Sequence, residues 1–212
     1  MEKSGLFISF EGTEGSGKST LAQHLSLHLE KLGYRTLQTR EPGGSAVGEK
    51  IRSILLHSDM DPWTELLLYQ AARAEHLATT LQPALQRGEI VLCDRFTDST
   101  LAYQAFARKL PWAKVNSLNQ IATRGLQPDL TLFLDIDPRT GLDRVKDPNR
   151  FEAEGLAFQK KVRSGYLKAR AQNPQRWLTL KIKSQSPEEL AEKVKTYLLK
   201  RFKNRLQGSN GR

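Results

Sequence analysis

The sequence of 212 residues is poor in cysteine and contains no long apolar segment. Its single cysteine, Cys93, excludes an internal disulfide, and its position after an apolar run indicates a buried core residue. No apolar run approaches the roughly 20 residues that span a bilayer. Because an apolar run begins at Leu6, there is no room for a signal peptide. We therefore expect a soluble cytoplasmic protein with a single domain over residues 1–212.

The net charge of +10 is concentrated in the C-terminal third of the chain. Residues 1–138 carry 14 basic and 16 acidic side chains, whereas residues 139–183 carry 12 basic and only 4 acidic ones. Residues 193–212 add 7 basic side chains and no acidic one. This excess indicates either a polyanionic ligand or a solvated basic face, and beyond about residue 203 we expect a frayed, solvated end.

Short apolar or β-branched runs alternate with longer helical patterns along the chain. The runs lie at 6–10, 36–39, 90–93, 130–134 and 178–182; the first helical pattern ends at Gly33, and later ones lie at about 45–57, 62–87, 97–107, 112–124, 152–172 and 187–203. Such alternation predicts a parallel sheet of five strands with helices on both faces. Ligands of such sheets collect at the carboxyl ends of the strands, so the segments after these runs are the candidates for function.

A glycine-rich motif directly follows the first of these runs. Residues 12–19 read GTEGSGKS and match the pattern G-x-x-x-x-G-K-[ST], in which backbone N–H groups turned inward bind phosphate oxygens. Lys18 is expected to bridge the terminal phosphates of ATP as a catalytic group, and the Ser19 hydroxyl to ligate Mg²⁺. The predicted ATP-binding residues are Gly12, Thr13, Glu14, Gly15, Ser16, Gly17, Lys18, Ser19 and Thr20. The structural alternative is a strand-to-helix turn that binds nothing.

Charged residues also follow the second and third runs. Asp94 and Arg95 come directly after the third run, and Arg52 lies on the helix that follows the second. Asp94 is expected to hold Mg²⁺ through water. Arg52 and Arg95 are candidates for a second phosphate site, because a planar guanidinium binds phosphate oxygens in pairs and keeps its charge at any working pH. For Arg52, the pattern fits an exposed helix residue equally well.

The sequence resembles the thymidylate kinase family over nearly its whole length. Three segments carry the resemblance: the phosphate loop at 10–20, REPGG at 40–44 and, most specifically, DRFTDSTLAYQ at 94–104. The resemblance implies an α/β, three-layer P-loop kinase fold with a short basic lid over about 138–152. It also implies phosphorylation of dTMP to dTDP by ATP with Mg²⁺, in a homodimer. We expect no membrane or nucleic-acid partner.

The resemblance further implies roles for side chains that bind the acceptor. Tyr69 and Arg73 share one helix face, where the ring would stack on thymine and the guanidinium would donate to an exocyclic oxygen. Glu14 would contact the 3′-hydroxyl of the sugar, and Tyr103 would close off the 2′ position. The full predicted dTMP-binding set is Glu14, Arg52, Tyr69, Arg73, Arg95, Ser99, Tyr103 and Gln104. The family more often has phenylalanine in place of Tyr69, and from the pattern alone core packing is the stronger interpretation of this residue.

Transfer between two phosphates needs charge compensation and no general base, because the second pKa of the acceptor phosphate is about 6. Lys18 and Mg²⁺ would serve the donor, and Arg52 and Arg95 the acceptor. Eukaryotic relatives also place an arginine inside the phosphate loop, where this chain has Gly15 and Ser16. The resemblance therefore implies that a lid arginine supplies this charge: Arg150, with Arg144 as a helper. A solvated basic loop is the alternative. The segment KIKS at 181–184, which the resemblance implies borders the adenine, departs from the family pattern.

Two other functions remain open. A deoxynucleoside kinase would use a carboxylate after the second strand, here Glu41, as a base, but an uncharged acceptor has no need of Arg52 together with Arg95. The phosphate loop and basic tail also fit a nucleotide-dependent switch or a nucleic-acid-binding ATPase. However, the sequence has no NKxD motif and no basic stretch interleaved with several aromatic residues.

Overall fold

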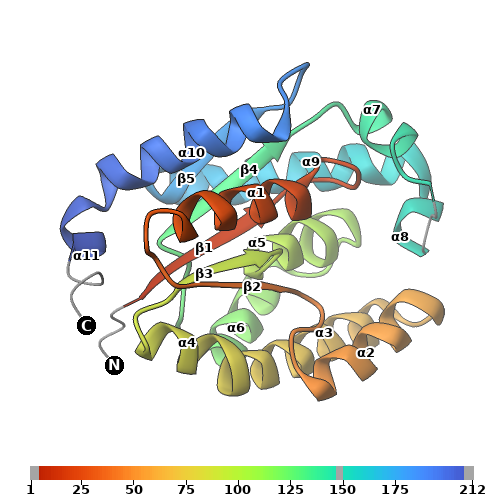
Figure 1. Ribbon diagram of the computed structural model, residues 1–212. Coiled ribbons are helices and arrows are strands. Elements are labelled where there is room, and N and C mark those ends of the chain that lie inside the picture. Colours follow the sequence, from red (N-terminus) through yellow and green to blue (C-terminus); the bar gives the residue numbers. More distant parts are fainter. Residues whose placement is uncertain (1–4, 147–149, 208–212) are drawn as a thin grey trace.

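A computed structural model of the chain describes residues 5–146 and 150–207 (Figure 1). Its centre is a five-stranded sheet in the order β2-β3-β1-β4-β5, in which every neighbouring pair is parallel. The strands are β1 (Leu6–Glu11), β2 (Thr36–Arg40), β3 (Ile90–Asp94), β4 (Leu130–Asp135) and β5 (Trp177–Lys181). The predicted fold class is confirmed, and each strand lies within a residue or two of its predicted run.

Helices cover both faces of the sheet and make three layers (Figure 1). They are α1 (Lys18–Glu30), α2 (Ala46–His57), α3 (Pro62–His76), η1 (Leu77–Leu81), α4 (Gln82–Gln86), α5 (Thr97–Thr100), η2 (Leu101–Ala107), α6 (Trp112–Thr123), α7 (Pro138–Asp143), α8 (Arg150–Ala153), α9 (Gly155–Gln172), η3 (Pro174–Arg176), α10 (Pro187–Arg201) and α11 (Lys203–Gln207). In the described residues no helix combines the length and the apolar character that crossing a membrane requires.

Alternation along the strands divides the core between the two faces. Ile8 and Phe10 of β1 pack with leucines of α1 and α10, whereas Phe7 points to the opposite face and packs on Phe96 and Cys93. Successive strand residues point to opposite faces, so β1, β3, β4 and β5 contribute side chains to clusters on both faces. Cys93 is a free, fully buried cysteine, as the sequence predicts.

Two of the predicted helices contain a wider turn. The patterns at 62–87 and 97–107 are helical throughout most of their length, but η1 and η2 within them follow the π-helical hydrogen-bond pattern. π turns inside α-helices frequently lie at functional sites. The segment η2 carries Tyr103 and Gln104, two of the predicted acceptor residues.

The expected frayed end beyond about residue 203 is corrected for residues 203–207. These residues form α11, because Leu206 is buried in the core formed by α1 and α10 and Arg205 pairs with Asp129 at 2.8 Å. An apolar side chain and an ion pair therefore hold the segment against the domain. The last five residues of the tail lie outside the described residues.

Candidate functional site

The phosphate loop connects the end of β1 to the start of α1. Gly15 and Gly17 adopt left-handed φ values of 66° and 87°, a conformation that glycine takes without steric cost. A Cβ atom at Gly15 would overlap the carbonyl oxygen of Gly141 in α7. The loop and the first helix of the predicted lid are therefore in direct backbone contact, with no side chain between them.

Lys18 lies inside this loop and is almost fully buried. Its ammonium group donates to the carbonyl oxygens of Thr13 at 3.0 Å and Gly12 at 3.3 Å. Burial and the neighbouring Arg95 guanidinium hold the pKa of Lys18 below its ordinary value. An anion in the loop would favour the charged form of this side chain.

The residues predicted to hold Mg²⁺ lie together at the start of α1 and the end of β3. The Ser19 hydroxyl donates to Asp94 Oδ2 at 2.5 Å, and Asp94 Oδ1 is buried with no hydrogen-bond partner in the described part of the chain. Hard oxygen ligands and a free carboxylate oxygen fit a hydrated Mg²⁺. The described residues contain no cluster of three or more His, Cys, Asp or Glu side chains that could hold a metal ion. These residues would therefore bind the ion together with water and nucleotide oxygens.

A cavity opens beside the phosphate loop, between α2, α3, η2 and α8. Its walls include Glu14, Arg52, Tyr69, Arg73, Arg95, Ser99, Tyr103 and Gln104. These are the eight residues of the predicted acceptor site, which come from four separate segments of the sequence. The remaining walls are Glu41, Pro42, Leu56, Phe96, Thr100 and Phe151. The contact of each side chain with a nucleotide stays a prediction.

Arg95 links the cavity to the phosphate loop. Its backbone has a φ of 71°, a left-handed conformation that is strained for a residue other than glycine. Its guanidinium donates to the carbonyl oxygen of Gly12 at 3.1 Å and to Glu14 Oε1 at 2.6 Å. The same group lies over the ring of Tyr103, with 5.0 Å between the guanidinium carbon and the ring centroid.

Glu14 accepts a second hydrogen bond, from the Tyr103 hydroxyl at 2.7 Å. Burial alone would raise the pKa of Glu14, but the charges of Arg95 and Lys18 outweigh it and hold the pKa below its ordinary value. The carboxylate is thus ionised within a phosphate loop, where two cations compensate it. It faces the cavity, as a partner for a sugar hydroxyl would.

Arg73 is fully buried and ion-paired with Glu41. Arg73 Nε donates to Glu41 Oε2 at 2.7 Å, and His76 Nδ1 lies 3.0 Å from Glu41 Oε1. Burial would raise the pKa of Glu41, but the Arg73 charge and the contacts with His76 lower it. Both carboxylate oxygens are therefore engaged by basic side chains. This arrangement makes Glu41 unsuitable as the base of a deoxynucleoside kinase.

Arg52 lines the cavity and donates to the carbonyl oxygen of Pro42 at 2.9 Å. Burial lowers the pKa of Arg52, and the like charges of Arg40 and Arg95 lower it further. Mutual repulsion of these guanidinium groups would be relieved by a bound phosphate. This part of the cavity is the best placed to hold an anion.

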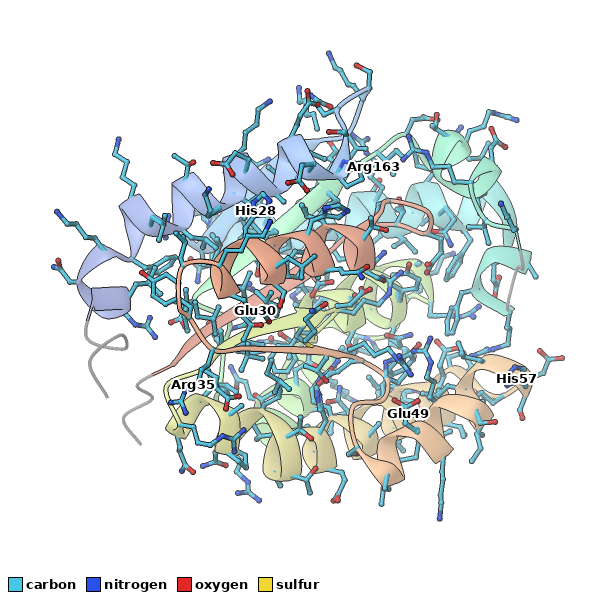
Figure 2. The ribbon with its side chains drawn as sticks, viewed as in Figure 1. His28, Glu30, Arg35, Glu49, His57 and Arg163 are labelled. Atoms are coloured by element: carbon cyan, nitrogen blue, oxygen red, sulfur yellow. The ribbon has the colours of Figure 1, made fainter. Side chains whose placement is uncertain are left out.

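The predicted lid arginines do not contact the phosphate loop within the described residues. Arg150 pairs with Glu65 at 2.8 Å and donates to the carbonyl oxygen of Leu55, and Arg144 is exposed at the end of α7. Part of the lid, at 147–149, lies outside the described residues. Arg163 of α9, which Figure 2 labels, pairs with Asp135 at the end of β4 at 2.7 Å.

Sequence reasoning missed two residues that support Arg95. Glu11 accepts from the Phe96 N–H at 2.9 Å and from the Ser99 hydroxyl at 2.6 Å, and Tyr166 contacts both Ser99 and Arg95 through its hydroxyl. Burial, with the neighbouring Asp98 charge, raises the pKa of Glu11 to about 7. A carboxylate at the end of an apolar strand is the signal for Glu11. Tyr166 lies within a basic helix that gives no such signal.

A parallel sheet in this order, with a phosphate loop after its central strand, defines a P-loop nucleotide-binding protein. The family model described as thymidylate kinase matches residues 10–194 of the chain. The chain belongs to the thymidylate kinase family.

Individual relatives agree with this assignment. The chain is 46% identical over 218 residues to a thymidylate kinase of Pelobacter propionicus, covering 97% of this chain and 98% of that protein. It is 51% identical over 182 residues to one of Syntrophotalea carbinolica, covering 80% and 84% of the two. It is also similar to the crystal structure of thymidylate kinase from Ehrlichia chaffeensis, with a TM-score of 0.77 and 30% identity over 92% of this chain and 98% of that one.

Proposed function

We propose that the protein transfers the γ-phosphoryl group of ATP to dTMP and forms dTDP. The observation that supports this most directly is the cavity beside the phosphate loop. It combines Arg52 and Arg95, two cations suited to a phosphate, with Tyr69 and Arg73, a ring and a donor suited to a pyrimidine base. Membership of the thymidylate kinase family supports the same substrate.

In this mechanism the phosphate loop and Lys18 hold the donor, and Arg52 and Arg95 hold the acceptor phosphate. Ser19 and, through water, Asp94 would hold Mg²⁺, which when bound neutralises charge on the donor phosphates. The acceptor phosphate is already ionised near neutral pH, so no protein base is required. Because Arg95 contacts Gly12 and Glu14 of the loop, it fixes the acceptor relative to the donor.

Arg150, helped by Arg144, is proposed to compensate the charge that develops on the transferred group. In other phosphoryl-transfer systems, an arginine in this role contributes about 10³ to 10⁵ in rate. Both residues lie on the basic segment that follows β4.

A coupled assay with ATP, Mg²⁺ and each nucleoside monophosphate in turn tests the proposal, with thymidine included as an uncharged acceptor. We expect turnover with dTMP to exceed turnover with every other acceptor. A preference for thymidine would overturn the proposal, because it would leave the two acceptor arginines without a purpose.

We also propose that the protein is a homodimer. The outward face of α3 is uncharged and carries Trp63, Leu67, Ala71 and Ala74, with Leu67 54% exposed. A contiguous apolar stripe of this kind marks an interface, and a second copy of the same chain would cover it symmetrically. Size-exclusion chromatography with light scattering should give a dimer for the unmodified protein and a monomer for Leu67→Glu.

A cytoplasmic location is proposed on the free cysteine. Cys93 is the only cysteine of the chain and forms no disulfide. A protein without disulfides fits a reducing compartment.

A further inference from the structure

Glu65 is a buried carboxylate that no step of the proposed mechanism uses. It lies in the first turn of α3 and is 1% exposed. Its Oε1 accepts from the side-chain amide of Gln104 at 2.8 Å. Its Oε2 pairs with Arg150 at 2.8 Å and with Arg108 at 3.3 Å. One carboxylate thus contacts both a wall of the acceptor cavity and the proposed catalytic arginine.

Every contact of the Arg150 guanidinium in the described residues is on the α2, α3 and α8 side of the cavity. Besides Glu65, the group donates to the carbonyl oxygen of Leu55 at 3.0 and 3.2 Å and lies over the ring of Phe151, 4.6 Å from its centroid. The protein itself therefore supplies an anion for Arg150. A phosphate group that recruits Arg150 has to compete with that anion.

Arg108 keeps Glu65 paired with a cation when Arg150 moves to a phosphate. A buried carboxylate that loses its only cation is strongly destabilised. Glu65 keeps Arg108 when Arg150 departs, and Arg108 is also paired with Glu154. The second arginine makes release of Arg150 feasible without leaving a buried charge unpaired.

We propose that Glu65 is a positioning residue: its ion pair with Arg150 governs how readily Arg150 reaches the transferred phosphate. Its hydrogen bond with Gln104 links the position of Arg150 to occupancy of the acceptor cavity. The proposal rests on the role of Arg150 in the proposed function. In the substrate-free enzyme, Glu65 holds Arg150 on α3. The apparent affinity for a ligand is proportional to the fraction of protein that is competent to bind it. The ion pair with Glu65 lowers the fraction in which Arg150 is free, and so weakens the binding of Arg150 to phosphate.

The variant Glu65→Gln tests the proposal, because it keeps an acceptor for Gln104 and removes the charge that holds Arg150. Two readouts are needed. In the substrate-free enzyme, amide hydrogen exchange of residues 150–153 should rise by about tenfold. In steady-state assays with saturating dTMP, kcat/KM for ATP should rise by about fivefold, because a larger fraction of Arg150 is available.

The double variant Glu65→Gln/Arg150→Gln separates positioning from structure. If Glu65 acts through Arg150, the substitution at Glu65 should change kcat/KM less than twofold when Arg150 is already replaced. The matched control is Glu154→Gln, which removes a carboxylate from Arg108 and leaves the contact with Arg150 intact. It should change neither exchange at 150–153 nor kcat/KM by more than about twofold.

A fall in kcat/KM for Glu65→Gln, or an equal effect with and without Arg150, would overturn the proposal. If Glu65→Gln fails to fold, Arg150→Gln alone tests the same pair, since loss of either partner should raise exchange at 150–153. Unchanged exchange in that variant would also overturn it. The exchange measurement uses no substrate, so a failure of the proposed activity would appear separately, in the assay of the unmodified protein.

Discussion

The guanidinium of Arg95 lies 2.6 Å from the carboxylate of Glu14, so an ion pair joins the acceptor cavity to the phosphate loop. A carboxylate in a phosphate loop repels a bound anion unless a cation compensates it. In the proposed mechanism the compensating cation, Arg95, is also the one that binds the acceptor phosphate. Arg95 would therefore set the distance between the two substrates.

Replacing Arg95 with lysine should reduce kcat/KM for dTMP by about 10²-fold or more, although the charge is retained. An ammonium group lacks the planar, paired donors with which the guanidinium can reach Gly12, Glu14 and a phosphate in fixed directions. Steady-state kinetics with dTMP varied would measure the loss, and the melting temperature would serve as the folding control. A loss smaller than tenfold would show that charge alone is sufficient at this position.

Replacing Glu41 with glutamine should destabilise the protein more than it slows the chemistry. The substitution leaves the Arg73 guanidinium buried without its carboxylate, which typically costs about 3–5 kcal/mol, so the melting temperature should fall by roughly 10 °C. KM for dTMP should rise, because Arg73 lines the cavity, and kcat should change less. Abolished turnover in a protein of unchanged stability would instead identify Glu41 as a base.

The stabilisation that the ion pair between Glu41 and Arg73 gives the folded protein depends on pH in a predictable way. The folded-state pKa of Glu41 lies below its ordinary value of 4.5, so the pair stabilises the protein above pH 4.5 and this stabilisation is lost as the pH falls further. The difference in melting temperature between the unmodified protein and Glu41→Gln should therefore shrink on acidification below that pH. A difference that stays constant would contradict the ion-pair assignment.

Glu11 should make the protein less stable as the pH rises, whereas the Glu41 pair loses its stabilising effect as the pH falls. The pKa of Glu11 is raised from 4.5 to about 7 in the folded protein, so the folded state holds more protons between these pH values and loses stability as the pH rises through them. The total loss is on the order of 3 kcal/mol. Glu11→Gln cannot ionise, so its melting temperature relative to the unmodified protein should increase by roughly 6–12 °C between pH 4.5 and pH 8.

Ser99→Ala is the matched control for this measurement. It removes the 2.6 Å hydrogen bond to Glu11 and keeps the carboxylate. The pH dependence should therefore persist in Ser99→Ala and be absent from Glu11→Gln. The same slope in all three proteins would exclude Glu11 as its source.

Adding a methyl group at Gly141 should weaken ATP binding. A Cβ atom there would overlap the carbonyl oxygen of Glu14 and push α7 away from the phosphate loop. Overpacking of this kind destabilises the packed arrangement by about 1–3 kcal/mol. A loss of about 1.4 kcal/mol in the binding free energy of ATP corresponds to a tenfold rise in KM for ATP. Gly125→Ala controls for a general loss of stability, because its left-handed φ of 78° strains an alanine while nothing lies within 4 Å of the added atom. Equal KM values for both variants would rule out the contact.

The sequence predicts the sheet and the phosphate loop because both depend on local patterns. Each strand is a short apolar run, and the loop at 12–19 is a contiguous motif. Arg52 and Arg95 are predicted from their positions after the strands, and the other acceptor residues from a family resemblance. The fold brings Arg52 and Tyr103 to one cavity from segments 51 residues apart. Which of them bind dTMP stays a prediction.

Other features could not be predicted because they depend on contacts between distant parts of the chain. Tyr166 meets Ser99 across 67 residues, and Arg205 meets Asp129 across 76. The tail at 203–207 looked solvated because its composition is basic, but the burial of Leu206 decides its structure. The resting place of Arg150 against Glu65 likewise depends on packing that no local pattern encodes.

The π turn of η2 sets the shape of one wall of the acceptor cavity. A π turn accommodates one residue more than the α-helical turn it replaces. If this turn closed to α-helical geometry without losing a residue, every side chain beyond it would rotate by about 100° around the helix axis. Gln104 would then lose its register with Glu65. The dimensions of this wall are thus set by the spacing of the main chain as much as by the identity of its side chains.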